Sequence, residues 1–176
     1  MLFRDLETPR LMLKTISSQD REFMLRQFTN NGVNQYLFDT EPLGSLEEAD
    51  ELIAFYMQPE PRSQQRWILI RKQDGAKIGT CGFHCWNTEA GHCEAGYDLD
   101  PAYWSQGYMR EAMEAILAFA RNDMKVKRVH ACIYPRNERS VALAEKLGFH
   151  FSGETKDEIF RGKAYEHRVY VLDFPA

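Results

Sequence analysis

Long hydrophobic runs are missing from this chain of 176 residues. No apolar stretch approaches the roughly 20 residues that a helix needs to span a bilayer. The first ten residues mix charged and apolar side chains and lack the apolar core of a signal peptide. The sequence therefore predicts a cytoplasmic protein with no membrane partner.

A basic excess is also missing. The formal net charge is −4, from 22 Lys and Arg against 26 Asp and Glu. Proteins that bind nucleic acid usually carry clustered positive charge, so this composition argues against nucleic acid as a partner. Mild acidity suits a cationic substrate, but ordinary solvated surfaces of this size show a similar imbalance.

Cysteine is scarce, with four residues at Cys81, Cys85, Cys93 and Cys132. Four scattered thiols do not make a disulfide scaffold, and the cytoplasm keeps them reduced. Cys81 and Cys85 would lie about 13 Å apart along one strand, with His84 on the opposite face, which is poor geometry for zinc. We expect buried structural thiols and predict no metal.

Caps, turns and hydrophobic periodicity predict the secondary structure. Helices are expected at about 17–30, 45–58, 107–122 and 137–148, and strands at about 10–14, 66–71, 77–86, 93–99, 128–134, 149–153 and 165–172. A polar loop is expected between the last two strands. This order predicts an α/β (α+β) fold in one domain, residues 1–176: a mixed, mostly antiparallel, twisted sheet of about seven strands with four helices on its faces.

Two segments carry candidate chemistry. In the first, a strand ends at Leu99, a short polar loop follows, and Gly107 permits a tight turn into a helix. The unpaired amides at a helix start favour an anion such as a pyrophosphate. In the second, Asn137 caps a helix that ends at Gly148.

The spacing of these segments resembles the GNAT acetyltransferase superfamily. Asn137-x-x-Ser140 and Glu145-Lys-Leu-Gly-Phe149 follow Trp104-Ser-Gln-Gly-Tyr108 by about 30 residues. The opening at 8–13 and the strand at 94–101 are similar to the branch that includes the ribosomal-protein N-terminal acetyltransferases. The resemblance covers essentially the whole chain.

The resemblance implies acetyl-CoA as cosubstrate and a primary amine as acceptor. In this family the fourth and fifth strands splay apart, and the pantetheine arm lies between them. Backbone groups of Tyr97, Asp98 and Leu99 would pair with the pantetheine, and Asn137 and Ser140 would lie by the thioester. The pyrophosphate would be held at Gln106, Gly107, Tyr108, Met109 and Arg110.

Three departures from the family pattern bear on this expectation. Met109 replaces a small residue, and Ser105 stands where this branch often has glycine. Binding is still expected, because backbone amides hold the phosphate. Ala144 stands where many members carry a tyrosine general acid, so the proton for the leaving thiolate must come from elsewhere.

Acyl transfer needs a neutral amine, and α-amines and lysines have pKa values of about 8 and 10.4. Glu94 is the candidate base, directly or through water, and burial would raise its pKa; the alternative is a solvated strand residue. Ser140 is the candidate for protonating or orienting the thiolate, and otherwise a plain first-turn serine. The backbone N–H of Tyr97 or Asp98 is the candidate oxyanion donor.

Several other side chains have two interpretations. Tyr134 is either a second acid or a buried strand residue. Tyr36, Phe38 and Trp86 either line an acceptor pocket or belong to the core. The run at 125–128 either meets the adenosine phosphate or is a solvated turn, and the five histidines show no spacing for a metal or a triad.

The acceptor amine is not identified by any motif. It is either a protein N-terminus or a small molecule, and the protein is a monomer or a homodimer. A non-catalytic module that binds CoA or a partner is the main alternative. A nucleotide-binding protein is disfavoured because the Gly107 loop lacks the long glycine-rich P-loop and its lysine.

Overall fold

The computed structural model describes residues 1–175. All eight strands form one sheet in the order β1-β2-β3-β4-β5-β6-β8-β7. The strands are β1 (Leu6–Glu7), β2 (Leu11–Thr15), β3 (Gln65–Arg71), β4 (Lys77–Asn87), β5 (His92–Leu99), β6 (Arg128–Ile133), β7 (His150–Phe160) and β8 (Lys163–Asp173). Every neighbouring pair is antiparallel except β5 and β6.

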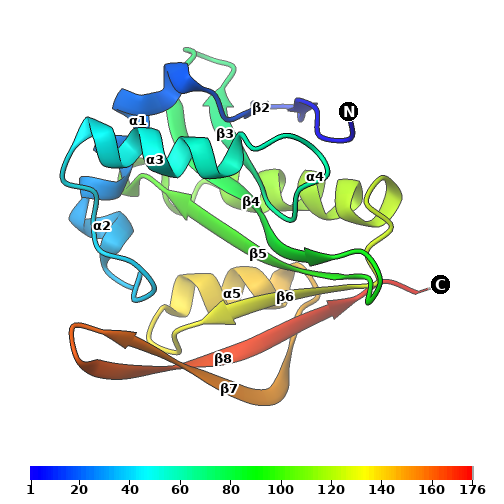
Figure 1. Ribbon diagram of the computed structural model, residues 1–176. Helices are drawn as coiled ribbons and strands as arrows, with labels where there is room; N and C mark the ends of the chain where they lie inside the picture. The colour runs from blue at the N-terminus through cyan, green and yellow to red at the C-terminus, as the bar shows by residue number, and fades with distance from the viewer. Residues whose placement is uncertain (176) are drawn as a thin grey trace.

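Helices cover both faces of the sheet (Figure 1). They are α1 (Arg21–Thr29), α2 (Asn31–Asn34), α3 (Leu46–Tyr56), α4 (Tyr108–Asn122) and α5 (Glu138–Lys146). The helices α1, α2 and α3 share one hydrophobic cluster around Ile68 of β3. The helices α4 and α5 pack on the opposite face around Trp67 and Phe83, in a larger cluster. The mixed sheet predicted from sequence is therefore confirmed.

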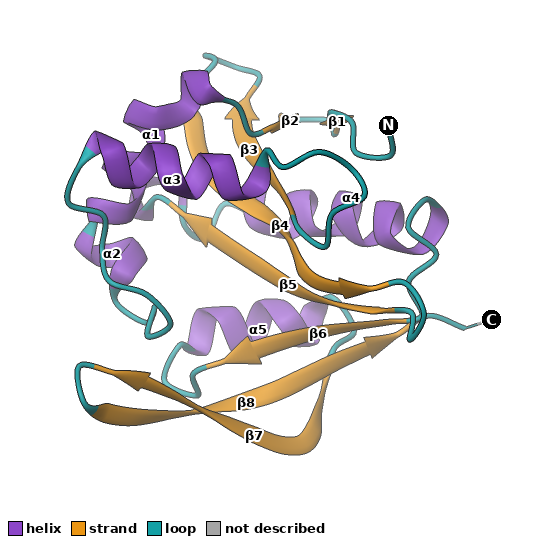
Figure 2. Ribbon diagram, viewed as in Figure 1, coloured by secondary structure: helices purple, strands orange, loops and turns teal. Residues whose placement is uncertain are grey.

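The pairing of β5 with β6 is short, and it decides where a ligand can enter. Within residues 1–175 its register runs only from His92↔Arg128 to Glu94↔His130. Beyond Glu94 the two strands diverge, as Figure 2 shows. The backbone edge of residues 95–99 is left facing an open gap, which confirms the splay that the resemblance implied.

Residues 154–164 do not form the polar loop expected between the last two strands, so this prediction is wrong. Residues 150–160 and 163–173 form a long antiparallel hairpin, with Phe160 opposite Lys163. Arg161 and Gly162 both have positive φ, 50° and 76°, as a tight two-residue turn requires. Almost every residue of β7 is exposed, so its sequence lacks the alternation by which strands are recognised.

The first helical region also differs from expectation. A 3-10 turn at Ser18–Asp20 precedes α1, and Asn31 and Gly32 do not end the helical region but form α2. The side chain of Asn30 caps α2 by accepting from the amide of Gly32 at 2.8 Å. The described residues contain eight strands and five α-helices rather than about seven and four, because β1 and α2 were not predicted.

Side chains cap several helices, and the predicted cap at Asn137 is confirmed. Ser45 accepts from the amide of Glu48 at 3.2 Å, although the Glu48 carboxylate accepts from Gly44 and not from Ser45. Asn137 accepts from the amide of Ser140 at 3.3 Å. Gly148 follows α5 with φ 92°, the left-handed conformation expected after a helix. Among residues 1–175, no helix combines the length and apolar character needed to cross a membrane.

Candidate active site

Two cavities open along the gap between β5 and β6. The larger, about 630 Å³, is lined by β5 from Glu94 to Asp98, by β6, and by the segment between α2 and α3. The smaller, about 520 Å³, reaches the start of α4 and the outer side of α5. Both are lined by Tyr36, Leu37, Tyr97, Asp98, Asn137 and Ser140. These six residues therefore mark the place where ligands in the two cavities would meet.

The start of α4 forms the far end of the smaller cavity. Gly107 is the N-cap residue, with φ 81° and no side-chain cap. In an α-helix of this kind the amides of Tyr108, Met109 and Arg110 have no intrahelical acceptor, and all three residues line the cavity. The helix dipole adds partial positive charge at this end. The arrangement suits a phosphate or pyrophosphate group.

Arg10 holds the loop before α4 in place. Its Nη1 donates to the carbonyl of Gln106 at 2.9 Å, and its Nε donates to Glu111 at 2.6 Å. The guanidinium also lies over the ring of Tyr108, 4.4 Å from its centroid. A side chain at Gly107 would approach Arg10 Nη2 to 3.3 Å. The N-terminal segment and the start of α4 are therefore one braced unit.

Glu111 completes this brace. Its Oε1 accepts from the hydroxyl of Thr8 at 2.6 Å and from the amide of Arg10 at 2.8 Å. Burial alone would raise the pKa of Glu111, but the hydrogen bonds from Thr8 and Arg10 outweigh it, so the pKa lies below its ordinary value.

The two unusual residues of this loop take different roles. Met109 is buried in the larger hydrophobic cluster, so its side chain fills the core and leaves its amide facing the cavity. Ser105 adopts φ 60°, a left-handed conformation that glycine reaches without strain. Glycine is the residue expected at this position from the family resemblance. Gln106 does not line either cavity within the described residues; its amide nitrogen donates to Ala102 at 3.1 Å.

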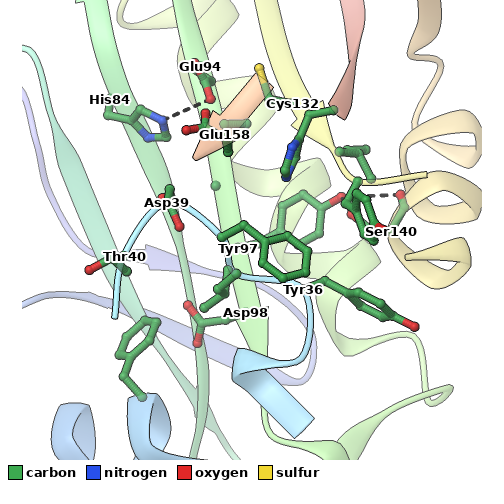
Figure 3. A pocket seen from close by; sticks show the side chains of 18 of the residues that line it. Tyr36, Asp39, Thr40, His84, Glu94, Tyr97, Asp98, Cys132, Ser140 and Glu158 are labelled. Carbon is green, nitrogen blue, oxygen red and sulfur yellow. Dashed lines mark hydrogen bonds and ion pairs between the residues drawn. The ribbon is translucent and has the colours of Figure 1, made fainter. Parts of the chain in front are cut away.

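A pair of hydroxyls lies where the cavities meet. Tyr97 Oη and Ser140 Oγ are 2.6 Å apart, joining β5 to the first turn of α5 (Figure 3). Burial raises the pKa of Tyr97 to about 12, against a smaller opposing effect of the Ser140 hydrogen bond. Sequence reasoning used only the backbone of Tyr97, because no motif connects residues 43 positions apart.

Asp98 belongs to a buried network. Its carboxylate accepts from Gln27 at 2.7 Å and pairs with Arg66 at 3.2 Å, and it also accepts from Thr80. Arg66 donates further to the hydroxyl of Tyr56 at 3.0 Å. Burial is the largest influence on the Asp98 carboxyl and raises its pKa. The side chain is thus committed to the interior, and only its backbone is available to a ligand.

Glu94 lies at the last position where β5 pairs with β6, and it lines the larger cavity. His84 Nε2, on the neighbouring strand β4, is 3.3 Å from Glu94 Oε1. Burial alone would raise the pKa of Glu94, but the hydrogen bond and charge of His84, together with Lys156, outweigh it. The pKa lies below its ordinary value, so the predicted rise is wrong. The cause is a neighbour from another strand, which the sequence does not reveal.

Cys85 corrects a second expectation. The predicted separation of His84 and Cys85 onto opposite faces is wrong, because β4 carries an irregularity between His84 and Asn87 and Cys85 has φ 52°. Ligand atoms of His84, Cys85 and Glu94 all lie within 4.8 Å of one another. The thiols also differ from expectation: Cys81 and Cys93 are buried, but Cys132 is half-buried and Cys85 is exposed.

Acidic and aromatic side chains dominate the larger cavity. Among the described residues that line it, seven are acidic and one, Arg66, is a permanent cation, which Asp98 neutralises. The acidic residues are Asp39, Glu41, Glu48, Glu51, Glu94, Asp98 and Glu158. Tyr36, Phe38 and Tyr134 supply aromatic faces. The cavity therefore favours a cation that also carries apolar surface.

Two contacts join the segment between α2 and α3 to the β7–β8 hairpin beside this cavity. Phe38 stacks on Tyr165 of β8, with ring centroids 3.7 Å apart and planes 8° apart. Glu41 forms a two-pronged ion pair with Arg161 at the tip of the hairpin. These contacts hold residues 36–43, which line the cavity, against the β7–β8 hairpin.

Other candidate residues lie elsewhere. Trp86 packs against Phe3, with centroids 6.1 Å apart, so the core interpretation holds for it. None of Lys125, Lys127 and Arg128 lines either cavity among the described residues. Arg128 instead pairs with Asp173 at 2.6 Å. Within this run Val126 is buried and Arg128 begins β6, so the run is only partly a solvated turn.

A family model described as an acetyltransferase (GNAT) domain matches residues 10–150. The chain belongs to the GNAT acetyltransferase family. An uncharacterised N-acetyltransferase of Bacillus subtilis, YoaA, is 30% identical over 176 residues, covering 99% of both chains. The spermidine N(1)-acetyltransferase of Escherichia coli is 21% identical over 162 residues, covering 92% of this chain and 84% of its own.

Solved structures agree on the fold of this GNAT protein. The spermidine N-acetyltransferase of Vibrio cholerae, solved with CoA and spermine, superimposes with a TM-score of 0.82. The match covers 93% of this chain and 95% of the other at 19% sequence identity.

The GNAT family uses acetyl-CoA, and the residues present fit that molecule. The smaller cavity offers the uncapped start of α4 for a pyrophosphate and basic side chains at Arg110, Arg139 and Lys146. The unpaired backbone edge of β5 offers hydrogen bonds for an extended amide chain. Both features lie along the path between β5 and β6 that the cofactor is expected to take.

Proposed function

We propose that this GNAT protein transfers the acetyl group of acetyl-CoA to a primary amine of a small cationic molecule. The observation that carries the proposal is the meeting of the two cavities at Tyr97, Asn137 and Ser140. A phosphate-binding helix start closes one cavity, and an acidic, aromatic chamber forms the other. The amine and the thioester would therefore approach each other in one ternary complex.

The backbone of β5 binds and orients the thioester in this proposal. Residues 97–99 pair with the pantetheine arm, and the amide of Tyr97 or Asp98 donates to the oxyanion. Amides at 107–110 hold the pyrophosphate, with Arg10 keeping the loop in place. Asn137 fixes the first turn of α5, and with it Ser140, beside the reacting carbon.

Glu94 and His84 act as a pair on the acceptor amine. The ionised Glu94 attracts the ammonium form, which loses one proton to solvent before it attacks, and Glu94, directly or through a water, accepts the second proton as the C–N bond forms. His84 holds the Glu94 carboxylate in place through the 3.3 Å contact. As the new C–N bond forms, the C–S bond breaks and CoA leaves as the thiolate.

Tyr97 and Ser140 receive that thiolate. With its pKa of about 12, Tyr97 is a weaker acid than an ordinary thiol, whose pKa is about 8.5. A hydrogen bond to the thiolate is therefore favourable, while complete proton transfer from Tyr97 is not. The thiolate takes its proton from solvent after release, which is consistent with Ala144 in place of a tyrosine.

The acceptor is a small molecule in this proposal because two contacts tie the segment that lines the larger cavity to the β7–β8 hairpin. These contacts are Phe38 with Tyr165 and Glu41 with Arg161. A protein N-terminus, the acceptor suggested by the resemblance to the ribosomal-protein branch, would have to part these contacts. The spermidine acetyltransferases among the relatives act on a flexible polycation, which such an acidic chamber suits.

Calorimetric titration with acetyl-CoA, followed by a CoA-release assay, tests the proposal. The acceptor panel would hold polyamines, amino acids, an aminoglycoside and a peptide with a free N-terminus. We expect one-to-one binding and turnover with di- or polycationic amines. Turnover with the peptide alone would overturn the small-molecule acceptor. Binding without turnover on any acceptor would favour a non-catalytic CoA-binding module.

Glu94→Gln separates catalysis from binding, because glutamine keeps the size of the side chain and removes its charge. Catalytic turnover should fall by about 10²- to 10⁴-fold, the range typical of a lost general base. Acetyl-CoA affinity should stay within twofold, since Glu94 lies in the larger cavity only. Full activity in Glu94→Gln would remove this residue from the mechanism.

A further inference from the structure

Three different metal-ligating groups meet at the rim of the larger cavity. His84 and Cys85 come from β4 and Glu94 from β5, and one ligand atom from each lies within 4.8 Å of the other two. His84 Nε2 and Glu94 Oε1 are 3.3 Å apart. The Cys85 thiol is exposed, so an ion from solvent can reach the group.

The irregularity in β4 creates this cluster. On a regular strand, adjacent side chains point to opposite faces, which would hold Cys85 away from His84. Here the register shifts between His84 and Asn87, and Cys85 takes φ 52°. The extra residue turns the thiol toward the side on which His84 meets Glu94.

The spacing suits a tetrahedral ion. Zinc binds imidazole nitrogen and carboxylate oxygen at about 2.0–2.1 Å and thiolate sulfur at about 2.3 Å. Two such ligands at a tetrahedral angle lie roughly 3.3–3.6 Å apart, which follows from those bond lengths. The His84–Glu94 separation of 3.3 Å already has this value. The mixed nitrogen, sulfur and oxygen set favours Zn²⁺ over Mg²⁺ or Ca²⁺, which prefer oxygen alone.

We propose that His84, Cys85 and Glu94 form an inhibitory Zn²⁺ site, with water in the fourth position. On binding, the Cys85 thiol releases its proton to solvent, and the His84–Glu94 hydrogen bond is replaced by two bonds to the metal. The ion occupies both groups that act on the amine. The proposal that the site binds metal depends only on the geometry of these three residues. The proposal that the metal inhibits the protein rests on the proposed function.

Titration with Co²⁺ and Zn²⁺ tests the site directly. We expect one Co²⁺ per chain with a thiolate-to-cobalt charge-transfer band, displaced by stoichiometric Zn²⁺. Cys85→Ser should abolish the band and weaken Zn²⁺ binding at least tenfold by calorimetry, and His84→Gln should weaken it similarly. Absence of the band in the unaltered protein, or its persistence in Cys85→Ser, would overturn the proposal.

Matched controls identify the ligands. Cys132→Ser removes the other thiol near Glu94, and His150→Gln removes an exposed histidine on β7. Both variants should keep the band and bind Zn²⁺ within twofold of the unaltered protein. Loss of the band in Cys132→Ser would assign the thiolate to that residue and overturn the role of Cys85.

An activity measurement keeps the two proposals apart. Each variant's acetyl transfer is expressed relative to its own rate in EDTA. Zn²⁺ should inhibit the unaltered protein in competition with the amine but not with acetyl-CoA, and inhibition should weaken at least tenfold in Cys85→Ser. If Zn²⁺ binds with the expected ligands and the rate is unchanged, the metal site stands and the proposed role of Glu94 and His84 fails.

Discussion

The contact between Tyr97 and Ser140 allows a quantitative prediction. Tyr97→Phe removes one hydroxyl, 2.6 Å from Ser140 Oγ, and keeps the ring that packs against the core. In the proposed mechanism this hydroxyl donates to the departing thiolate. A hydrogen bond to a charged group contributes about 1.5–3 kcal/mol. Since about 1.36 kcal/mol corresponds to a factor of ten in rate, kcat should fall about 10- to 150-fold.

Stability should respond much less than catalysis. The lost hydrogen bond joins two neutral groups, so the free energy of unfolding should fall by about 0.5–1.5 kcal/mol. The KM for the amine should stay nearly constant, because the hydroxyl acts only when charge develops on sulfur. Steady-state CoA release at saturating acetyl-CoA, with urea unfolding of each variant, measures both effects.

A double-mutant cycle tests whether the two hydroxyls act as a unit. Ser140→Ala should lower kcat by a similar factor, and the double variant should be little worse than either single variant. Multiplicative losses would show that the two hydroxyls act separately. A kcat within twofold in Tyr97→Phe would refute the reasoning, because the thiolate would then leave without help from this pair.

Three further predictions concern the scaffold. Gly107→Ala should lower the free energy of unfolding by about 1–2 kcal/mol through its left-handed φ and weaken acetyl-CoA binding, as calorimetry would measure. The control Gly75→Ala, at φ 71° in a remote turn with open space around it, should lower stability alone. Equal acetyl-CoA affinities in the two variants would contradict this. Asp98→Ala leaves Arg66 buried without its carboxylate and should lower the free energy of unfolding by about 3–5 kcal/mol in urea, and a loss below about 1 kcal/mol would contradict the network. Because the folded-state pKa of Glu111 lies below the ordinary value of 4.5, its contribution is present above that pH and lost as pH falls through the folded pKa. Glu111→Gln should therefore be less stable at pH 7 and lose less stability on acidification, as unfolding at several pH values would measure.

The features that the sequence predicted well are those set by near neighbours in the chain. The cap at Asn137 and the left-handed glycines at Gly107 and Gly148 each depend on residues within about four positions. The order of strands and helices follows from hydrophobic periodicity in the same way. The mixed sheet followed from that order, and the gap beside β5 followed from the family resemblance.

The elements that were missed are those whose surroundings hide the local signal. The strand β7 is exposed along almost its whole length and so lacks alternation, and its residues 154–160 lie beyond the strand predicted at 149–153. The helix α2 is a single turn that depends on the Asn30 cap. Both segments are too polar for hydrophobic periodicity to identify.

The chemistry of the site depended on contacts between distant residues. The hydroxyl pair joins Tyr97 to Ser140 across the gap, and the pKa of Glu94 is lowered by His84 on another strand. The bulge that turns Cys85 toward them is set by strand pairing. The sequence by itself determined the order of the elements, the caps and turns, and the candidate residues of β5, α4 and α5. Only the tertiary structure decided their protonation and partners, because desolvation and charge act through space over a few ångströms, whatever the separation along the chain.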